Sequence, residues 1–220
     1  MNRHLATATV LLALLGMHGA WAQSSCGDLG NAYGPFDYRT DRHKLGIVEQ
    51  FHFTPEVEAL IRGKSSPIVG NDLDYTLRAF PNHHRALAAL TRHGQRTKSP
   101  QPAGLRYPVD CYFERAVRFR PDDTTVRILL AGHLFRTGRT DEALVQLRVA
   151  GEAASTNGFT HYNIGLAYFD MKRYDKALEH AHRAMQLGFV ERQELKKQLE
   201  GIGRWVEPAG EPATPAQPAS

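Results

Sequence analysis

Histidine is the residue type in this chain best suited to chemistry, because its imidazole binds transition metals and transfers protons near neutral pH. The sequence contains 11 histidines, of which His83 and His84 are adjacent and His180 and His182 are two residues apart. Neither spacing brings two rings to one ion on a helix, as an i,i+4 pair would. His52 is a further candidate if folding brings it to His83 or His84. A metal-binding or hydrolytic module using His52, His83 and His84 is therefore the alternative function.

Other catalytic patterns have little support in this sequence. It contains no Gly-x-Ser-x-Gly turn and no glycine loop of the kind that holds a phosphate. Asp72 and Asp74 are carboxylates close together in sequence, but most proteins offer such pairs. We therefore predict no catalytic residue, no cofactor and no bound metal, and we expect that the protein is not an enzyme.

The charge balance also excludes a class of partner. The chain has 27 Lys and Arg against 23 Asp and Glu, which gives a formal net charge of +4. It has no basic runs interleaved with aromatics, the pattern that single-stranded nucleic acid would require. We therefore expect no nucleic-acid partner.

The start of the chain has the features of a secretory signal peptide. Arg3 precedes the apolar run 10–15, and the small-residue sequence Ala20-Trp21-Ala22 follows. The apolar run is far shorter than the ~20 residues that span a bilayer. We predict cleavage near Ala22, a periplasmic or secreted location, and no membrane span.

Export changes how the two remaining cysteines, Cys26 and Cys111, are interpreted. Thiols in an oxidising compartment tend to pair, so a disulfide is the leading prediction. Its loop would contribute on the order of 4 kcal/mol in the chain-entropy account. The alternative is two separate thiols, since pairing requires Cα atoms within about 7 Å.

The residues that could bind a partner lie within a repeated sequence pattern. This pattern predicts the helices that position them. Small and aromatic landmarks occur in segments 164–168 and 174–178, and again at Ala184 and Gly188. A shift of 34 residues matches Ala177 with Ala143, Ala184 with Ala150, Gly165 with Ala131 and Ile164 with Leu130. Spacing and chemistry both resemble the tetratricopeptide repeat, which implies antiparallel helix pairs stacked into a solenoid and a role in binding proteins.

Flanking segments extend the pattern. Upstream, a helix from His84 to about His93 and a second helix ending near Phe119 resemble a further pair, stretched by six residues at the loop 94–108. Asp72 to Ala79 is expected to form another helix. Downstream, an apolar stripe predicts a capping helix, and its residues are Leu195, Leu199, Ile202 and Trp205.

These observations predict an all-α fold, a short α-solenoid of about three helical hairpins with a capping helix, preceded by an irregular N-terminal segment. The expected divisions are a signal peptide (1–22), an N-terminal segment of unknown type (23–70), the repeat domain (71–205) and a disordered tail (206–220). Within the N-terminal segment, Thr54-Pro55-Glu56 marks a helix start, and alternation over 47–53 permits a short strand.

The resemblance implies a concave groove that holds a protein or peptide segment. One stripe of the last repeat would line it, namely Phe159, Tyr162, Leu166 and Phe169, with Asn163 beside them. Its other end would be basic, through Arg85, Arg92 and Arg136. Aromatic side chains in such a groove suit an apolar helix or peptide. The alternative is that the protein's own N-terminal segment, held by Cys26 and Cys111, fills the groove.

Overall fold

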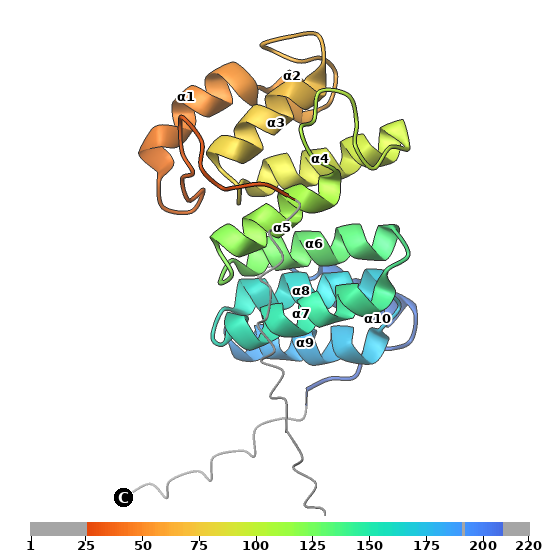
Figure 1. The fold of residues 1–220 in the computed structure, drawn as a ribbon. Helices are drawn as coiled ribbons and strands as arrows, with labels where there is room; N and C mark the ends of the chain where they lie inside the picture. The colour runs from red at the N-terminus through yellow and green to blue at the C-terminus, as the bar shows by residue number, and fades with distance from the viewer. Residues whose placement is uncertain (1–25, 191, 209–220) are drawn as a thin grey trace, which may run out of the picture.

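The computed structural model describes residues 26–190 and 192–208, which form ten α-helices and no strand (Figure 1). The helices are α1 (Arg42–His52), α2 (Pro55–Glu58), α3 (Val69–Ala79), α4 (His84–Thr97), α5 (Val109–Phe119), α6 (Thr124–Arg136), α7 (Thr140–Ala154), α8 (Gly158–Asp170), α9 (Tyr174–Gln186) and α10 (Glu194–Gly201). The predicted all-α solenoid is therefore confirmed. The proposed signal peptide lies outside the described residues, as do residues 209–220 of the predicted tail.

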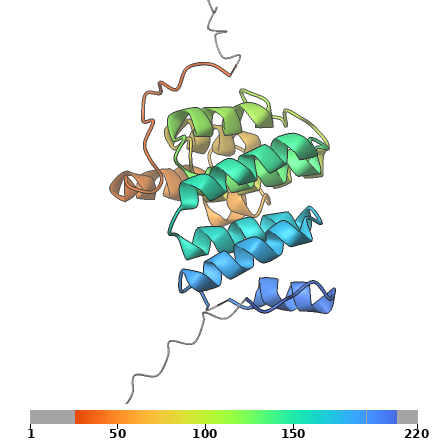
Figure 2. The ribbon, with the colours of Figure 1, turned by 90° about the horizontal axis from the view of Figure 1, so that it is seen from below.

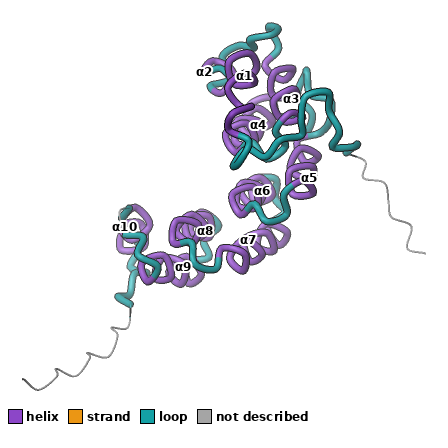
Figure 3. Tube along the Cα trace, turned by 90° about the vertical axis from the view of Figure 1, so that its left-hand side faces the viewer, coloured by secondary structure: helices purple, strands orange, loops and turns teal. Residues whose placement is uncertain are grey.

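The helices are arranged in two layers that curve together (Figure 3). Helices α4, α6, α8 and α10 lie on the concave side, and α3, α5, α7 and α9 lie on the convex side. Figure 2 shows α10 at the C-terminal end of this stack, beside α9. Among the helices that the structure describes, none is long and apolar enough to cross a membrane.

Small side chains set the spacing within the regular hairpins α6–α7 and α8–α9. Ala143 and Ala177 are fully buried, as the repeat predicts. At Gly165, an added Cβ would lie 2.5 Å from a Leu195 side-chain carbon and 3.3 Å from the Ala177 carbonyl oxygen. The helices can approach this closely because these positions carry almost no side chain.

The N-terminal segment is more helical than the sequence predicts. Residues 47–53, which permit a strand by alternation, lie in and directly after α1. The buried residues of α1 are Leu45 and Val48, which share one helix face, whereas Ile47 and Phe51 are exposed. Helix α1 packs against α3, so it covers the first helix pair of the stack. The predicted helix start at Thr54-Pro55 is present, but α2 ends at Glu58.

The C-terminal cap is shorter than predicted. Leu195 and Leu199 are buried, but α10 ends at Gly201, so Ile202 and Trp205 follow the helix. Ile202 is exposed, whereas Trp205 packs on the core and contacts the edge of the His182 ring. The helix thus covers the last repeat with two leucines, and the following loop supplies the tryptophan.

A disulfide joins the start of the described chain to α5. Cys26 and Cys111 are bonded, with their Cα atoms 5.0 Å apart, which confirms the predicted pair. Arg115, one turn further along α5, is almost completely buried and donates from Nη1 to the carbonyl oxygens of Cys26 and Asp28 at 3.0 and 2.5 Å. The same backbone is therefore fixed both covalently and by a buried guanidinium.

A buried polar network holds the next part of this segment. The Asn82 side-chain amide donates to Asp37 at 2.7 Å and to Asp123 at 2.9 Å. Asp123 also caps α6 by accepting from the Val126 backbone N–H. Burial alone would raise the pKa of Asp37, but hydrogen bonds from Arg39 and Asn82 hold it well below its usual range. Asp37 is therefore ionised, and the network joins residues before α1 to the start of α6.

Candidate interaction sites

The aromatic residues predicted to line the concave side divide between core and surface. Phe159, near the start of α8, is 47% exposed, and its ring lies 5.5 Å from Phe189. Tyr162 is buried, with its ring 5.2 Å from the same phenylalanine. Phe169 is half-buried and its ring lies 5.3 Å from Tyr174. Phe159 thus offers the most aromatic surface on α8.

The remaining residues of α8 add polar and apolar surface. Asn163 and Leu166 are half-buried, one turn and two turns after Phe159. Arg192 places its guanidinium 5.9 Å from the centroid of the Phe159 ring. A cation over an aromatic face is a weak attraction at an exposed site.

The arginines at the predicted basic end of the concave side have partners within the protein itself. Arg85 pairs with both oxygens of Glu58, a residue of α2, and with Glu49 of α1. Arg92 donates to the Glu58 carbonyl oxygen at 3.0 Å, and Arg96 donates to the Leu60 carbonyl oxygen at 2.5 Å. Arg85 and Arg92 therefore contact α2, although both residues remain exposed. At this end, part of the N-terminal segment lies against the predicted basic residues.

Arg136, the third predicted arginine, lines a cavity of about 490 Å³. This cavity lies between the C-terminal ends of α4 and α6 and the start of α5. Burial lowers the pKa of Arg136, and Asp170 opposes that change. In the same cavity His133 contacts Asp110 at 2.6 Å. Arg136 is thus separated from the arginines of α4 and belongs to a different surface.

The three histidines of the alternative metal site have separate partners. Nδ1 of His52 contacts Asp72 at 2.9 Å, and His84 contacts Asp123. His83 caps α4, accepting from the Ala86 backbone N–H through Nδ1. In the described part of the chain, the only trio of metal-ligating side chains with adjacent ligand atoms contains the two oxidised cysteines. The metal or hydrolytic alternative therefore gains no support.

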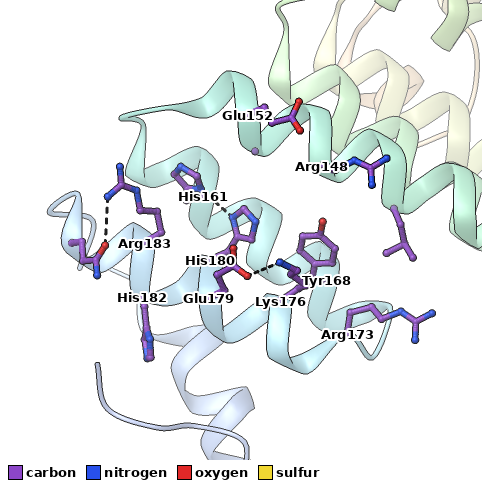
Figure 4. A pocket seen from close by; sticks show the side chains of 13 residues that line it. Arg148, Glu152, His161, Tyr168, Arg173, Lys176, Glu179, His180, His182 and Arg183 are labelled. Carbon is purple, nitrogen blue, oxygen red and sulfur yellow. Dashed lines mark hydrogen bonds and ion pairs between the residues drawn. The ribbon is translucent and has the colours of Figure 1, made fainter. Parts of the chain in front are cut away.

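A pocket of about 760 Å³ lies between α7 and α9, with residues of α8 at its floor (Figure 4). His161 from α8 and His180 from α9 meet in it, with their Nδ1 atoms 3.0 Å apart. Burial, followed by the neighbouring His161, lowers the pKa of His180 to about 4. His161 lies 3.4 Å through Nε2 from the Ser155 carbonyl oxygen, so its Nδ1 accepts from His180. The two rings form a neutral, hydrogen-bonded pair.

Sequence reasoning missed this pair because it compared His180 with His182 on one helix. The relevant partner lies across the hairpin. Helices α8 and α9 are antiparallel about the turn at 171–173, where the Arg173 N–H bonds to the Tyr168 carbonyl oxygen. That turn places His161 opposite His180, and the antiparallel pairing implied by the repeat was the signal available.

Three concave helices, α4, α6 and α8, begin with the same kind of cap. Side chains of His83, Asp123 and Asn157 cap α4, α6 and α8, each accepting from the backbone N–H three residues later. Asp123 and Asn157 are 34 residues apart, the period of the tetratricopeptide repeat. The family model described as Tetratricopeptide repeat matches residues 159–187. This segment is a tetratricopeptide repeat. No curated protein matches the chain.

The match covers most of α8 and α9, so the repeat contains both Phe159 and the histidine pair. Tetratricopeptide repeats build interaction surfaces from the helices of successive pairs. In this chain the repeat offers two surfaces, the concave face of α8 and the pocket between α7 and α9. The tetratricopeptide segment is therefore the region in which a protein partner is expected.

Proposed function

We propose that this protein is an exported adaptor that holds a segment of a partner protein against the concave face of α8. The observation that carries the proposal is the half-exposed ring of Phe159 in a position whose counterpart on α4 already binds a chain segment. Export is supported by the signal-like start of the sequence and by the disulfide, which is typical of oxidising compartments.

Residues of α4 and α8 can be compared by their distance in sequence from the N-cap of each helix. Arg85, Arg92 and Arg96 are the second, ninth and thirteenth residues after the N-cap His83. All three contact α2 or Leu60, which lie on the concave face of α4 as a docked segment. The concave face can therefore hold a short segment whose polar groups complement those of the helix.

The same three positions on α8 have a different chemistry. They are Phe159, Leu166 and Asp170, counted from the N-cap Asn157. Phe159 contacts Phe189 and Arg192 and remains 47% exposed. An apolar position beside a carboxylate suits a partner helix or peptide that presents an apolar side chain next to a basic one.

Phe159→Ala tests this function, with Phe51→Ala as the matched control. Phe51 lies on α1 and is 49% exposed, against 47% for Phe159. Partners would be captured on the mature protein from the compartment in which it is found, and thermal unfolding would be measured in parallel. We expect Phe159→Ala to lose a partner that the native protein and Phe51→Ala both retain, with all three folded. Retention of every partner by folded Phe159→Ala would show that the site lies elsewhere.

Cell fractionation with N-terminal sequencing tests export separately. We expect the mature chain outside the cytoplasm, beginning at Gln23. A cytoplasmic protein beginning at Met1 would contradict export and leave the partner site to be judged on Phe159 alone.

A further inference from the structure

Helices α7 and α9, which flank the pocket, belong to the convex layer (Figure 3), and the concave residues of the proposed function do not line it. Its walls carry four cations and two carboxylates, namely Arg148, Arg173, Lys176, Arg183, Glu152 and Glu179. Lys176 pairs with Glu179 at 2.7 Å. Arg148, Arg173 and Arg183 form no ion pair with other described residues, and Arg183 contacts only the Gln186 amide, at 3.5 Å.

The cations follow the length of the pocket. Arg173, Lys176 and Arg183 are spaced along one side of α9, and Arg148 faces them from α7 (Figure 4). Ten residues separate Arg173 from Arg183. At a rise of about 1.5 Å per residue, they span roughly 15 Å. A single phosphate or carboxylate is too small to contact both ends of this row.

An extended peptide has a matching spacing. Side chains on one face of an extended chain recur about every 7 Å, so alternate acidic residues reach successive cations along such a row. The charge-assisted hydrogen bonds that arginine makes with a carboxylate are stronger than neutral ones. The row therefore favours a ligand with several carboxylates over one with a single anionic group.

The floor of the pocket is formed by a glycine and by neutral rings. Gly151 of α7 faces His180, and an added Cβ there would lie 3.2 Å from Cε1 of that ring. Tyr168 also lines the floor, and burial raises the pKa of its hydroxyl, so it remains a neutral donor. The histidine pair is neutral, so the positive charge of the pocket comes from its rim.

We infer that the pocket between α7 and α9 binds an extended acidic peptide segment of a partner protein. The site uses Arg148, Arg173 and Arg183 to contact successive carboxylates, above a floor formed by Tyr168 and the pair of histidines. None of these residues belongs to the concave face, so this inference is independent of the proposed function.

Fluorescence anisotropy with a labelled peptide in which glutamate alternates with glycine tests the site on the intact, disulfide-bonded protein. We expect binding that weakens as salt is added, and no binding of the matching glutamine peptide. Arg148→Gln with Arg183→Gln should weaken binding about tenfold or more, which corresponds to about 1.4 kcal/mol. The control is Arg106→Gln with Lys197→Gln, two exposed cations outside the pocket, which should bind as the native protein does.

Three results would overturn the inference. They are equal binding of the glutamine peptide, unchanged binding by the folded Arg148 and Arg183 variant, and complete displacement of the peptide by inorganic phosphate at a matched concentration of charge. The last would show that a single anion suffices. Phe159→Ala should leave the binding of this peptide unchanged, so loss of concave binding and loss of convex binding are distinguished in the same experiment.

Discussion

Helices α4 and α8 begin in the same way, each with a side chain that caps the backbone three residues later, yet their concave faces differ. The face of α4 is basic and is paired with α2, whose Glu58 contacts Arg85. The face of α8 carries Phe159, whose exposed fraction is similar to that of the Arg85 side chain. The two faces therefore differ in chemistry, since the exposed cations of α4 have acidic partners in the same chain and the exposed ring of α8 is apolar.

The two ends of this short solenoid are covered in different ways. A terminal repeat exposes its stacking face unless something covers it. At the C-terminal end α10 covers the face with Leu195 and Leu199. At the N-terminal end the cover is larger, comprising α1, α2 and the segment joined by Cys26 to α5. The N-terminal region thus depends on a covalent and polar attachment, and the C-terminal repeat depends on close packing.

Among the changes that test this contrast, removal of the disulfide should have the largest effect on the free energy of unfolding. Cys26 and Cys111 are 85 positions apart in sequence, so the chain-entropy account predicts that Cys26→Ser with Cys111→Ser lowers the free energy of unfolding by about 4 kcal/mol. Urea unfolding measures the loss, and hydrogen exchange should locate the first loss of protection before α1, with α8 and α9 still protected. Two reactive thiols in the unfolded, unreduced native protein would instead show that the attachment is absent.

Overpacking the repeat should be the next largest effect, and it should act on the other end of the molecule. Ala177 is fully buried between α8 and α9, so Ala177→Leu should cost about 1 to 3 kcal/mol. Thermal unfolding measures it, with Glu179→Leu as the exposed control on the same helix. Equal stability of the two variants would contradict the close contact assigned to Ala177.

The packing of the repeat helices can be predicted from the sequence, because small residues recur at the positions where two helices meet. The alanines at 143 and 177 and the glycine at 165 must be small for two helices to approach, so their spacing is visible without coordinates. Alternation over 47–53 was a weaker signal, since most of these residues also fit a helix in which Leu45 and Val48 share one buried face. Over seven residues, period alone does not separate strand from helix.

The surfaces were harder to predict, since they depend on contacts between distant segments. Arg85 and Arg92 have the spacing of a basic groove, and nothing in their own helix reveals that Glu58 will cover them. The pairing of His161 with His180 requires the register of the hairpin as well as the repeat. Cysteine pairing was simpler, because the sequence offered two thiols and one possible bond.

Acid should weaken the repeat through the histidine pair. The pKa of His180 is about 4 in the folded protein, below the ordinary value of 6.5, so the unfolded chain binds a proton first. Stability is therefore complete above pH ~6.5 and declines as the pH falls toward ~4. The contribution is about 1 to 2 kcal/mol, allowing for solvent screening in an open pocket. Urea midpoints from pH 7 to 4.5 should fall less for His180→Gln than for the native protein, and parallel slopes would contradict the assignment.

The smallest effect is expected from loss of the charge that pairs α2 with α4. Glu58→Gln removes the charge that pairs with Arg85 while keeping the shape of the side chain, and this pair is only partly buried. The loss in stability should therefore be about 1 kcal/mol or less. The clearer change should be local: faster hydrogen exchange and proteolysis over α2 and residues 60–67, with Phe159 and the α8 amides unaffected.

Glu142→Gln, which removes an exposed i,i+3 pair with Arg139 on α7, is the matched control. If α2 keeps its protection in Glu58→Gln, apolar contacts of Val57 and Leu60 hold the cover, and the contrast between α4 and α8 is one of packing. If protection is lost, the contrast is one of charge, because the α4 face then accepts only a segment that brings its own acceptors to Arg85 and Arg92.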